Sequence, residues 1–209
     1  SKQHLYQMLD DSDRRPGFRH ELASALGLFS ILASYYPQHA ALLGPWTEVL
    51  AKLVPSAVTY GISKPPQMTP LISELLSCTA EEFDLVVYLV ASHHGKVRVA
   101  LHASPKDQEY RDRDGRGLPI RGIREGDSIP EVVLRSGELP IPTVNLTLSP
   151  ASLGLSPQTG RSWRERCISL TRRHSPGTLA FLEAILCAAD RRASALKTED
   201  PVLRAEVQA

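Results

Sequence analysis

Three histidines and one aspartate occur where a fold could gather their side chains around a metal ion. They are His20, the adjacent pair His93 and His94, and Asp190. Imidazole nitrogens and carboxylate oxygens suit divalent transition metals such as manganese, iron, cobalt and nickel. Such an ion activates a bound water and polarises a phosphoryl oxygen. The chemistry expected of this group is therefore metal-assisted hydrolysis, with one or two ions.

His20 lies in the first turn of a helix predicted over residues 18–36, in which leucine and phenylalanine recur at helical spacing. Ala23, Ser24 and Gly27 share its helical face, and such small side chains let another helix or a bound ion approach closely. The alternative is that His20 faces solvent, as side chains in a first helical turn often do.

The pair His93 and His94 ends a second predicted helix. Thr79 and Glu82 form a capping box that starts this helix, and Gly95 is well placed to terminate it. The helix is apolar on nearly all sides, so at least one of the two histidines projects toward the core. Adjacent helical residues point about 100° apart. We therefore expect the two rings to reach different ions, or one ion and a substrate phosphate.

Asp190 lies on the last predicted helix, over about residues 175–196, which Ser and Pro open as N-cap and first residue. The predicted buried stripe of this helix consists of Leu179, Leu182, Leu186, Ala189 and Ala193. On or beside that stripe, a carboxylate needs a cation, a dense set of hydrogen bonds or a raised pKa. A metal ion would be such a cation. The alternative is an ion pair with Arg191 or Arg192.

The segment between the second and the last of these helices has the sequence pattern of a small β insertion. Residues 97–101 alternate between apolar and other side chains, residues 104–126 are rich in charge and glycine, and short strand-like runs follow at 131–135 and 143–148. We expect a small sheet or a pair of hairpins over about residues 97–148.

Further helices are predicted on both sides of that insertion. Residues 40–53 read as a helix interrupted by Gly44 and Pro45, and the proline-rich residues 61–70 read as a loop. A capping box of Ser162 and Glu165 predicts that helical structure resumes there. The 209 residues are enough for one substantial core, so we expect one mainly α domain with a β insertion.

Composition excludes several classes of protein. The three cysteines form no Cys-x-x-Cys pair, so neither a disulfide framework nor a thiolate zinc site is indicated, and a reducing cytoplasm fits best. No apolar run reaches the roughly 18 residues of a membrane span. No Gly-x4-Gly-Lys-Ser/Thr loop occurs, so ATP-driven unwinding is not encoded in these residues.

The net charge of +1, from 24 basic and 23 acidic residues, gives no general argument for a nucleic-acid partner. A local basic cluster could still line the path of a DNA strand. It consists of Arg161, Arg164, Arg166, Arg172 and Arg173. The alternative is that these arginines form an ordinary solvated helix face.

Three sequence strings closely resemble the HD nuclease domain of the CRISPR-associated helicase-nuclease of type I systems. They are FRHELAS at residues 18–24, ASHHGKVR at 91–98 and AADRRAS at 188–194. The segments at 122–127, 162–163 and 179–184 look like the subtype in which this domain lies at the C-terminal end of the helicase chain. The resemblance spans nearly the whole chain.

This resemblance implies an HD-superfamily helical domain that holds one or two transition-metal ions and cuts single-stranded DNA. It implies partners as well: a helicase domain, on the same or a separate chain, and the CRISPR DNA-targeting complex. Carried over by position, His20, His93, His94 and Asp190 are metal ligands, and His93 and His94 take part in catalysis. Lys96 would contact a phosphate, or it is a solvated loop lysine.

The chain departs from the family pattern near its start. The family has an early His and a His-Asp dyad followed by x-Gly-Lys, whereas His4 is followed by Leu5. Residues 1–9 resemble the stretch that follows the dyad, so we expect His-Asp-x-Gly-Lys immediately upstream of Ser1. Without the dyad aspartate, which bridges two ions, these residues would hold one ion weakly, or two ions if the upstream segment is supplied.

Two other functions fit the same residues. The first is an HD phosphohydrolase that acts on small nucleotides. The second is a catalytically inactive fragment that docks on a helicase or on the DNA-targeting complex, and the absent dyad favours it. The expectation that we carry forward is a metal-dependent phosphodiesterase that acts as a deoxyribonuclease.

Overall fold

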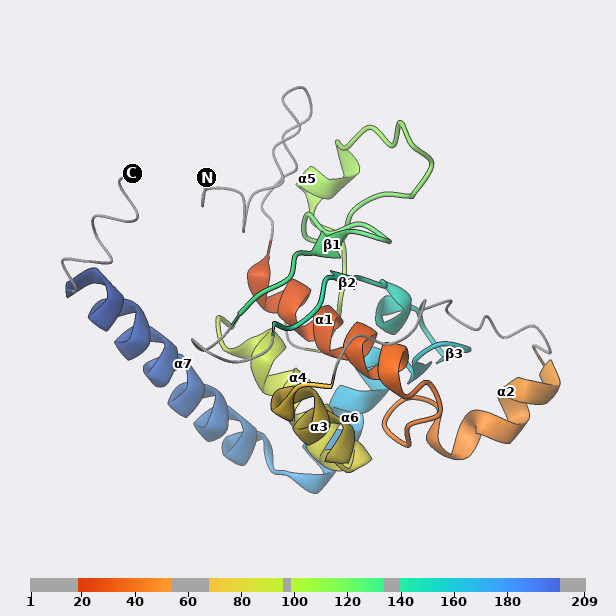
Figure 1. Ribbon diagram of the computed structural model, residues 1–209, viewed down its shortest axis with the longest axis horizontal. Coiled ribbons are helices and arrows are strands. Elements are labelled where there is room, and N and C mark those ends of the chain that lie inside the picture. The colour runs from red at the N-terminus through yellow and green to blue at the C-terminus, as the bar shows by residue number, and fades with distance from the viewer. Residues whose placement is uncertain (1–18, 54–67, 96–98, 134–139, 200–209) are drawn as a thin grey trace.

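The computed structural model describes residues 19–53, 68–95, 99–133 and 140–199, which Figure 1 draws in colour. The chain is mainly helical, as predicted. Its helices are α1 (His20–Tyr35), α2 (Thr47–Leu53), α3 (Pro70–Ser77), α4 (Ala80–Ser92), α5 (Pro105–Gln108), α6 (Trp163–Arg173) and α7 (Pro176–Glu199). Two short 3-10 helices, η2 (Gly44–Trp46) and η3 (Ser149–Ala151), accompany them.

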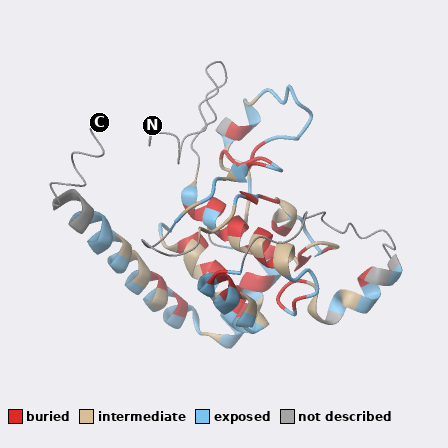
Figure 2. Ribbon diagram, in the orientation of Figure 1, coloured by how far each residue is buried: buried red, intermediate tan, exposed pale blue. Residues whose placement is uncertain are grey.

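The core forms where α1 packs across α4, and α3 and α6 enclose the pair (Figures 1 and 2). The rings of Phe29 and Phe83 meet edge to face, with centroids 5.2 Å apart. Tyr88 of α4 stacks on Trp163 of α6 at 6.4 Å. Full burial of one large apolar side chain contributes about 1.5–3 kcal/mol. The helices that carry the histidines therefore have their positions fixed by the main core.

Helix α4 begins and ends as its sequence predicts. The hydroxyl of Thr79 accepts a hydrogen bond from the backbone N–H of Glu82, and the Glu82 carboxylate accepts one from the backbone N–H of Thr79. At the other end His93 is the C-cap, and Gly95 adopts the left-handed conformation with φ of +69°. This geometry fixes where the histidine pair leaves the helix.

The predicted loop at residues 61–70 is wrong at its last residue. Residues 54–67 lie outside the described part of the chain, but Pro70 is the first residue of α3. Thr69 caps this helix, because its hydroxyl accepts a hydrogen bond from the N–H of Ile72 at 3.2 Å. Proline is favourable at the first position of a helix, where its missing N–H has no helical partner.

The β insertion contains less strand than its pattern predicts. Strands β1 (Ser128–Ile129) and β2 (Val144–Asn145) pair antiparallel, and an isolated bridge between Val132 and Ile141 lies beyond them. Of the run predicted at 97–101, the described residues 99–101 form no strand.

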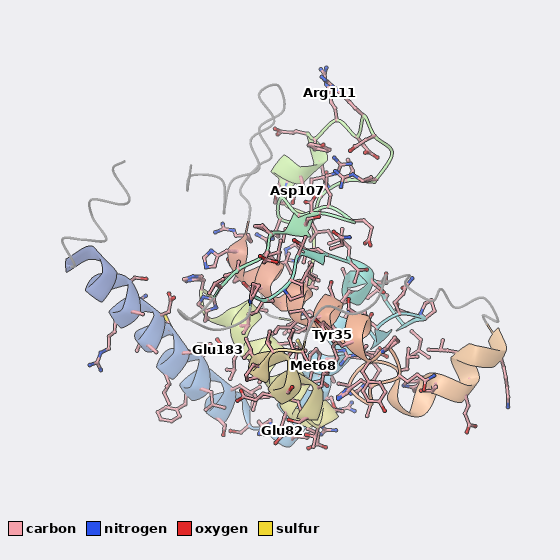
Figure 3. All side chains as sticks on the ribbon, in the orientation of Figure 1. Tyr35, Met68, Glu82, Asp107, Arg111 and Glu183 are labelled. Carbon is pink, nitrogen blue, oxygen red and sulfur yellow. The ribbon has the colours of Figure 1, made fainter. Side chains whose placement is uncertain are left out.

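Buried charges order much of the insertion instead. The guanidinium of Arg124, which is 1% exposed, contacts the carboxylates of Asp112 and Asp114. The carboxylate of Asp107, labelled in Figure 3, accepts hydrogen bonds from the backbone N–H groups of Arg121 and Gly122, both at 2.9 Å. These polar contacts, and not strand pairing, hold the charge-rich loop.

A second hairpin, of β3 (Leu155–Ser156) and β4 (Gly160–Arg161), lies outside the predicted insertion. Gly160 has φ of +68°, and a Cβ atom there would lie 1.9 Å from the carbonyl oxygen of Leu42. Only glycine permits this approach. The hairpin leads directly into α6, where Ser162 and Glu165 form the predicted capping box.

Helix α7 runs beside α4, and its C-terminal end extends away from the other helices (Figure 1). The predicted buried stripe is therefore correct only in part. Leu179 is buried, Leu182 and Leu186 are half-buried, and the alanines at positions 189 and 193 are exposed. No helix in the described part of the chain is both long enough and apolar enough to cross a membrane.

Candidate metal centre

Three histidine side chains meet where the first turn of α1 lies beside the end of α4. His20, His93 and His94 each offer one ring nitrogen, and the three atoms lie within 4.8 Å of one another. The Nε2 atoms of His20 and His94 are 2.9 Å apart. The ring centroid of His93 is 4.0 Å from that of His94 and 5.9 Å from that of His20. The structure thus brings together three of the four predicted ligands.

Both adjacent histidines face His20 although His93 keeps helical geometry. His93 is the C-cap of α4, with φ of −57° and ψ of −21°, and its N–H donates to the carbonyl oxygen of Leu89. The two side chains still converge, with ring centroids 4.0 Å apart, and the His94 ring meets that of His20 at 4.8 Å. The expectation that the pair reaches two different ions, or an ion and a phosphate, is therefore replaced by two rings that can share one ion.

The ring orientation of His93 is fixed by the backbone. Its Nδ1 atom lies 2.7 Å from the carbonyl oxygen of Val90 and donates a hydrogen bond to it. In this tautomer Nε2 keeps its lone pair. Histidines that bind metals commonly hold their second ring nitrogen in this way, which fixes the ring and raises its basicity as a ligand.

The surroundings of His94 favour its neutral ring. Partial desolvation and then the neighbouring rings of His93 and His20 lower the pKa of His94, while the carboxylates of Glu21 and Asp190 oppose that shift. A lowered pKa keeps the ring deprotonated near pH 7. Because a metal ion binds only the deprotonated ring, these electrostatics suit a cation-binding site.

The spacing of the nitrogens is slightly too short for a bound ion. Two nitrogen ligands of a tetrahedral ion, each bonded at about 2.1 Å, lie about 3.4 Å apart. The Nε2 atoms of His20 and His94 are at 2.9 Å. They must therefore separate by about half an ångström, which is a small movement for exposed rings. Three imidazoles would leave the remaining positions of one ion open to water and substrate.

Asp190 is not part of this cluster. It is half-buried on α7 and close enough to His94 to act on its pKa, but its oxygens are outside the group of ligand atoms. The alternative prediction also fails, because no ion pair joins it to Arg191 or Arg192 in the described part of the chain. Lys96, the predicted phosphate contact, lies outside the described residues.

The small residues of α1 have different surroundings. A Cβ atom on Gly27 would lie 3.1 Å from Cδ1 of Ile129, so at this position the β1–β2 hairpin approaches the helix, whereas Ala23 is buried in the core. Ser24 is exposed. His20 itself is 50% exposed, yet its ring turns toward His94. The solvent-facing alternative therefore describes this side chain only in part.

The basic cluster of α6 does not form one DNA-facing surface. Arg166 is 1% exposed, and Arg166 and Arg161 both bind the carboxylate of Asp84. Arg173 pairs with Glu81 at 3.1 Å. The prediction that all five arginines line a strand path is therefore wrong for Arg166, which supports the core.

Sequence reasoning missed two buried polar residues beside the histidines. Glu21 directly follows His20, and Ser92 directly precedes His93, and both are 1% exposed. A signal for Glu21 exists, because this charged residue lies among the apolar residues of the first turns of α1.

No model of a known protein family matches the chain, and neither a curated protein nor a solved structure is significantly similar to it. The function must therefore be inferred from the arrangement of the residues themselves.

Proposed function

We propose that this chain is an HD-superfamily nuclease domain, which uses a divalent transition metal to cleave single-stranded DNA. In this proposal it acts in the cytoplasm, beside a helicase domain and the DNA-targeting complex of a type I CRISPR system. The observation that supports it most strongly is the convergence of His20, His93 and His94. Two of the three strings that resemble the HD nuclease contain these histidines.

The three histidines would hold the ion through ring nitrogens. A bound ion of this kind supplies an activated water and polarises a phosphoryl oxygen. His93 presents Nε2 because Val90 holds its Nδ1. His20 and His94 are exposed, so a phosphodiester of a flexible strand can approach the open side of the site. Asp190 of α7 is the remaining proposed ligand, and its carboxylate would have to come closer to the three ring nitrogens to share the ion.

A nuclease assay tests this proposal. The purified chain should degrade circular single-stranded DNA in the presence of manganese, nickel or cobalt, and it should stop when a chelator is added. His93→Ala should abolish cleavage. His174→Ala is the matched control, because His174 is the C-cap of α6 as His93 is the C-cap of α4.

The other outcomes distinguish the alternatives. Full activity in chelator would contradict metal-dependent cleavage. Release of phosphate from small nucleotides, with DNA left intact, would favour a nucleotide phosphohydrolase. A protein that binds no metal, and in which His93→Ala changes nothing, would be an interaction module.

A further inference from the structure

A buried carboxylate lies directly behind the histidine cluster. Glu21 is 1% exposed, and its Oε1 atom has no hydrogen-bond partner in the described part of the chain. Its Oε2 atom is 3.6 Å from Nδ1 of His20. The carboxylate also acts electrostatically on His94, whose pKa it raises against the effect of the other histidines. Glu21 therefore lies beside the His20 ring and close enough to His94 to act on its charge.

A buried carboxylate oxygen without a hydrogen-bond partner is unusual, because its desolvation costs several kcal/mol unless another group compensates. Only three buried side-chain atoms in the described residues lack a hydrogen-bond partner: Glu21 Oε1, Ser92 Oγ and Arg124 Nε. Two of them belong to residues adjacent in sequence to the histidines of the cluster. Most of the buried side-chain atoms without a hydrogen-bond partner in the described residues therefore belong to neighbours of the candidate metal ligands.

We infer that Glu21 is a positioning residue of the metal centre, which accepts a hydrogen bond from Nδ1–H of His20 so that Nε2 faces the ion. This inference rests on the proposed function. The carbonyl of Val90 already holds His93 in the equivalent way, at 2.7 Å. The present 3.6 Å between His20 and Glu21 is longer than a hydrogen bond. A small turn of the His20 ring closes that contact.

Charge supports the same assignment. Three neutral imidazoles leave the charge of a divalent ion uncompensated, and a buried carboxylate behind one of them offsets part of it. In turn the cation offsets the charge of Glu21, whose Oε1 atom has no hydrogen-bond partner among the described residues. Outer partners of this kind typically contribute about 10- to 100-fold to metal affinity.

The test uses zinc, a diamagnetic ion that binds imidazole, and the full chain. Titration calorimetry should show about 10- to 100-fold weaker zinc binding in Glu21→Leu, which removes the acceptor at similar volume. Glu21→Gln should fall between this variant and the wild type, because its carbonyl still accepts a hydrogen bond. Glu183→Gln is the matched control: Glu183 is also buried, but it accepts a hydrogen bond from Tyr88 Oη and lies between α4 and α7 (Figure 3).

The ring nitrogens provide a second measurement that a purely structural role would not change. In the zinc-bound wild type, ¹⁵N spectra should show the proton of His20 on Nδ1 and the metal on Nε2. In Glu21→Leu the two tautomers should mix. If Glu21→Leu and Glu21→Gln bind zinc as tightly as the wild type, the inference fails and the proposed function stands. If the wild type binds neither zinc nor the manganese, nickel or cobalt of the nuclease assay, both fail.

Discussion

Helix α4 carries buried polar groups toward both of its ends, and their surroundings differ. In its first half Asp84 is 1% exposed, and its two oxygens accept hydrogen bonds from Arg166 and Arg161. The guanidinium of Arg166 also donates to the carbonyl oxygen of Thr159 at 2.6 Å and to that of Arg161 at 3.1 Å. It lies 5.0 Å from the centroid of the Phe29 ring. This network is satisfied within the protein.

At the other end, α4 leads into His93 and His94, and the His94 ring contacts those of His93 and of His20 from α1. Buried oxygens of Glu21 and Ser92 lack partners in the described part of the chain. A satisfied buried network stabilises one conformation. Groups left unsatisfied beside exposed imidazoles retain their capacity for a ligand. Substitutions at the first site should therefore lower the stability of the fold, and substitutions at the second should lower metal affinity.

The largest expected effect follows from Asp84→Ala. This change leaves the guanidinium of Arg166 buried without its counter-ion, which costs about 3–5 kcal/mol of unfolding free energy. Urea unfolding measures the loss. The double variant Asp84→Ala, Arg166→Met should recover part of it, because no uncompensated charge then remains in the core. A single-variant loss below about 1 kcal/mol would contradict the contrast between the two sites.

His93→Ala should weaken zinc binding strongly and change the stability of the fold little. Zinc affinity should fall by more than about 100-fold, because a direct ligand contributes more than an outer partner does. In chelator, the unfolding free energy should change by no more than about 1 kcal/mol, since the ring is only half-buried. Calorimetry and urea unfolding of the same preparation provide both numbers. His174→Ala should change neither quantity strongly.

Zinc itself should stabilise the folded chain. At a free concentration about 100 times the dissociation constant, a ligand specific for the native state adds about 2.7 kcal/mol. Urea unfolding with and without zinc measures this gain. The gain should disappear in His93→Ala and persist in Arg161→Met, which alters only the other network. An equal gain in the wild type and in His93→Ala would place the ion elsewhere.

Arg161→Met should give the smallest effect. Arg161 is the second partner of Asp84, but its side chain is 30% exposed and solvent screens its charge. We expect a loss of about 1 kcal/mol or less in unfolding free energy. A loss as large as that of Asp84→Ala would show that the two arginines act as one unit.

Local signals predicted most of the helices. The capping boxes at Thr79 and at Ser162 fix two helix starts through contacts three residues apart, so the sequence alone reveals them. The insertion was harder to predict, because a buried Arg124 and a buried Asp107 order it and neither leaves a periodic pattern. The network around Asp84 was missed for a similar reason, since Arg166 lies 82 positions away and reads as one of several surface arginines.

The candidate metal site was predictable in its residue types and in part of its geometry. Two predicted helices do bring His20 to His93 and His94. The convergence of the two adjacent rings depends on their side-chain rotations, which the spacing of residues along a helix does not predict. The sequence places Asp190 on or beside a buried stripe, but in α7 the burial decreases from Leu179 to the exposed Ala189, and the Asp190 carboxylate lies outside the cluster.

The most direct test of the metal centre is anomalous diffraction from crystals of the full chain grown with zinc. The account predicts an anomalous peak bonded to ring nitrogens of His20, His93 and His94 at about 2.1 Å. Such a peak would also show whether Asp190 moves in to bind. A zinc peak bonded to other residues, with none among the three rings, would contradict it.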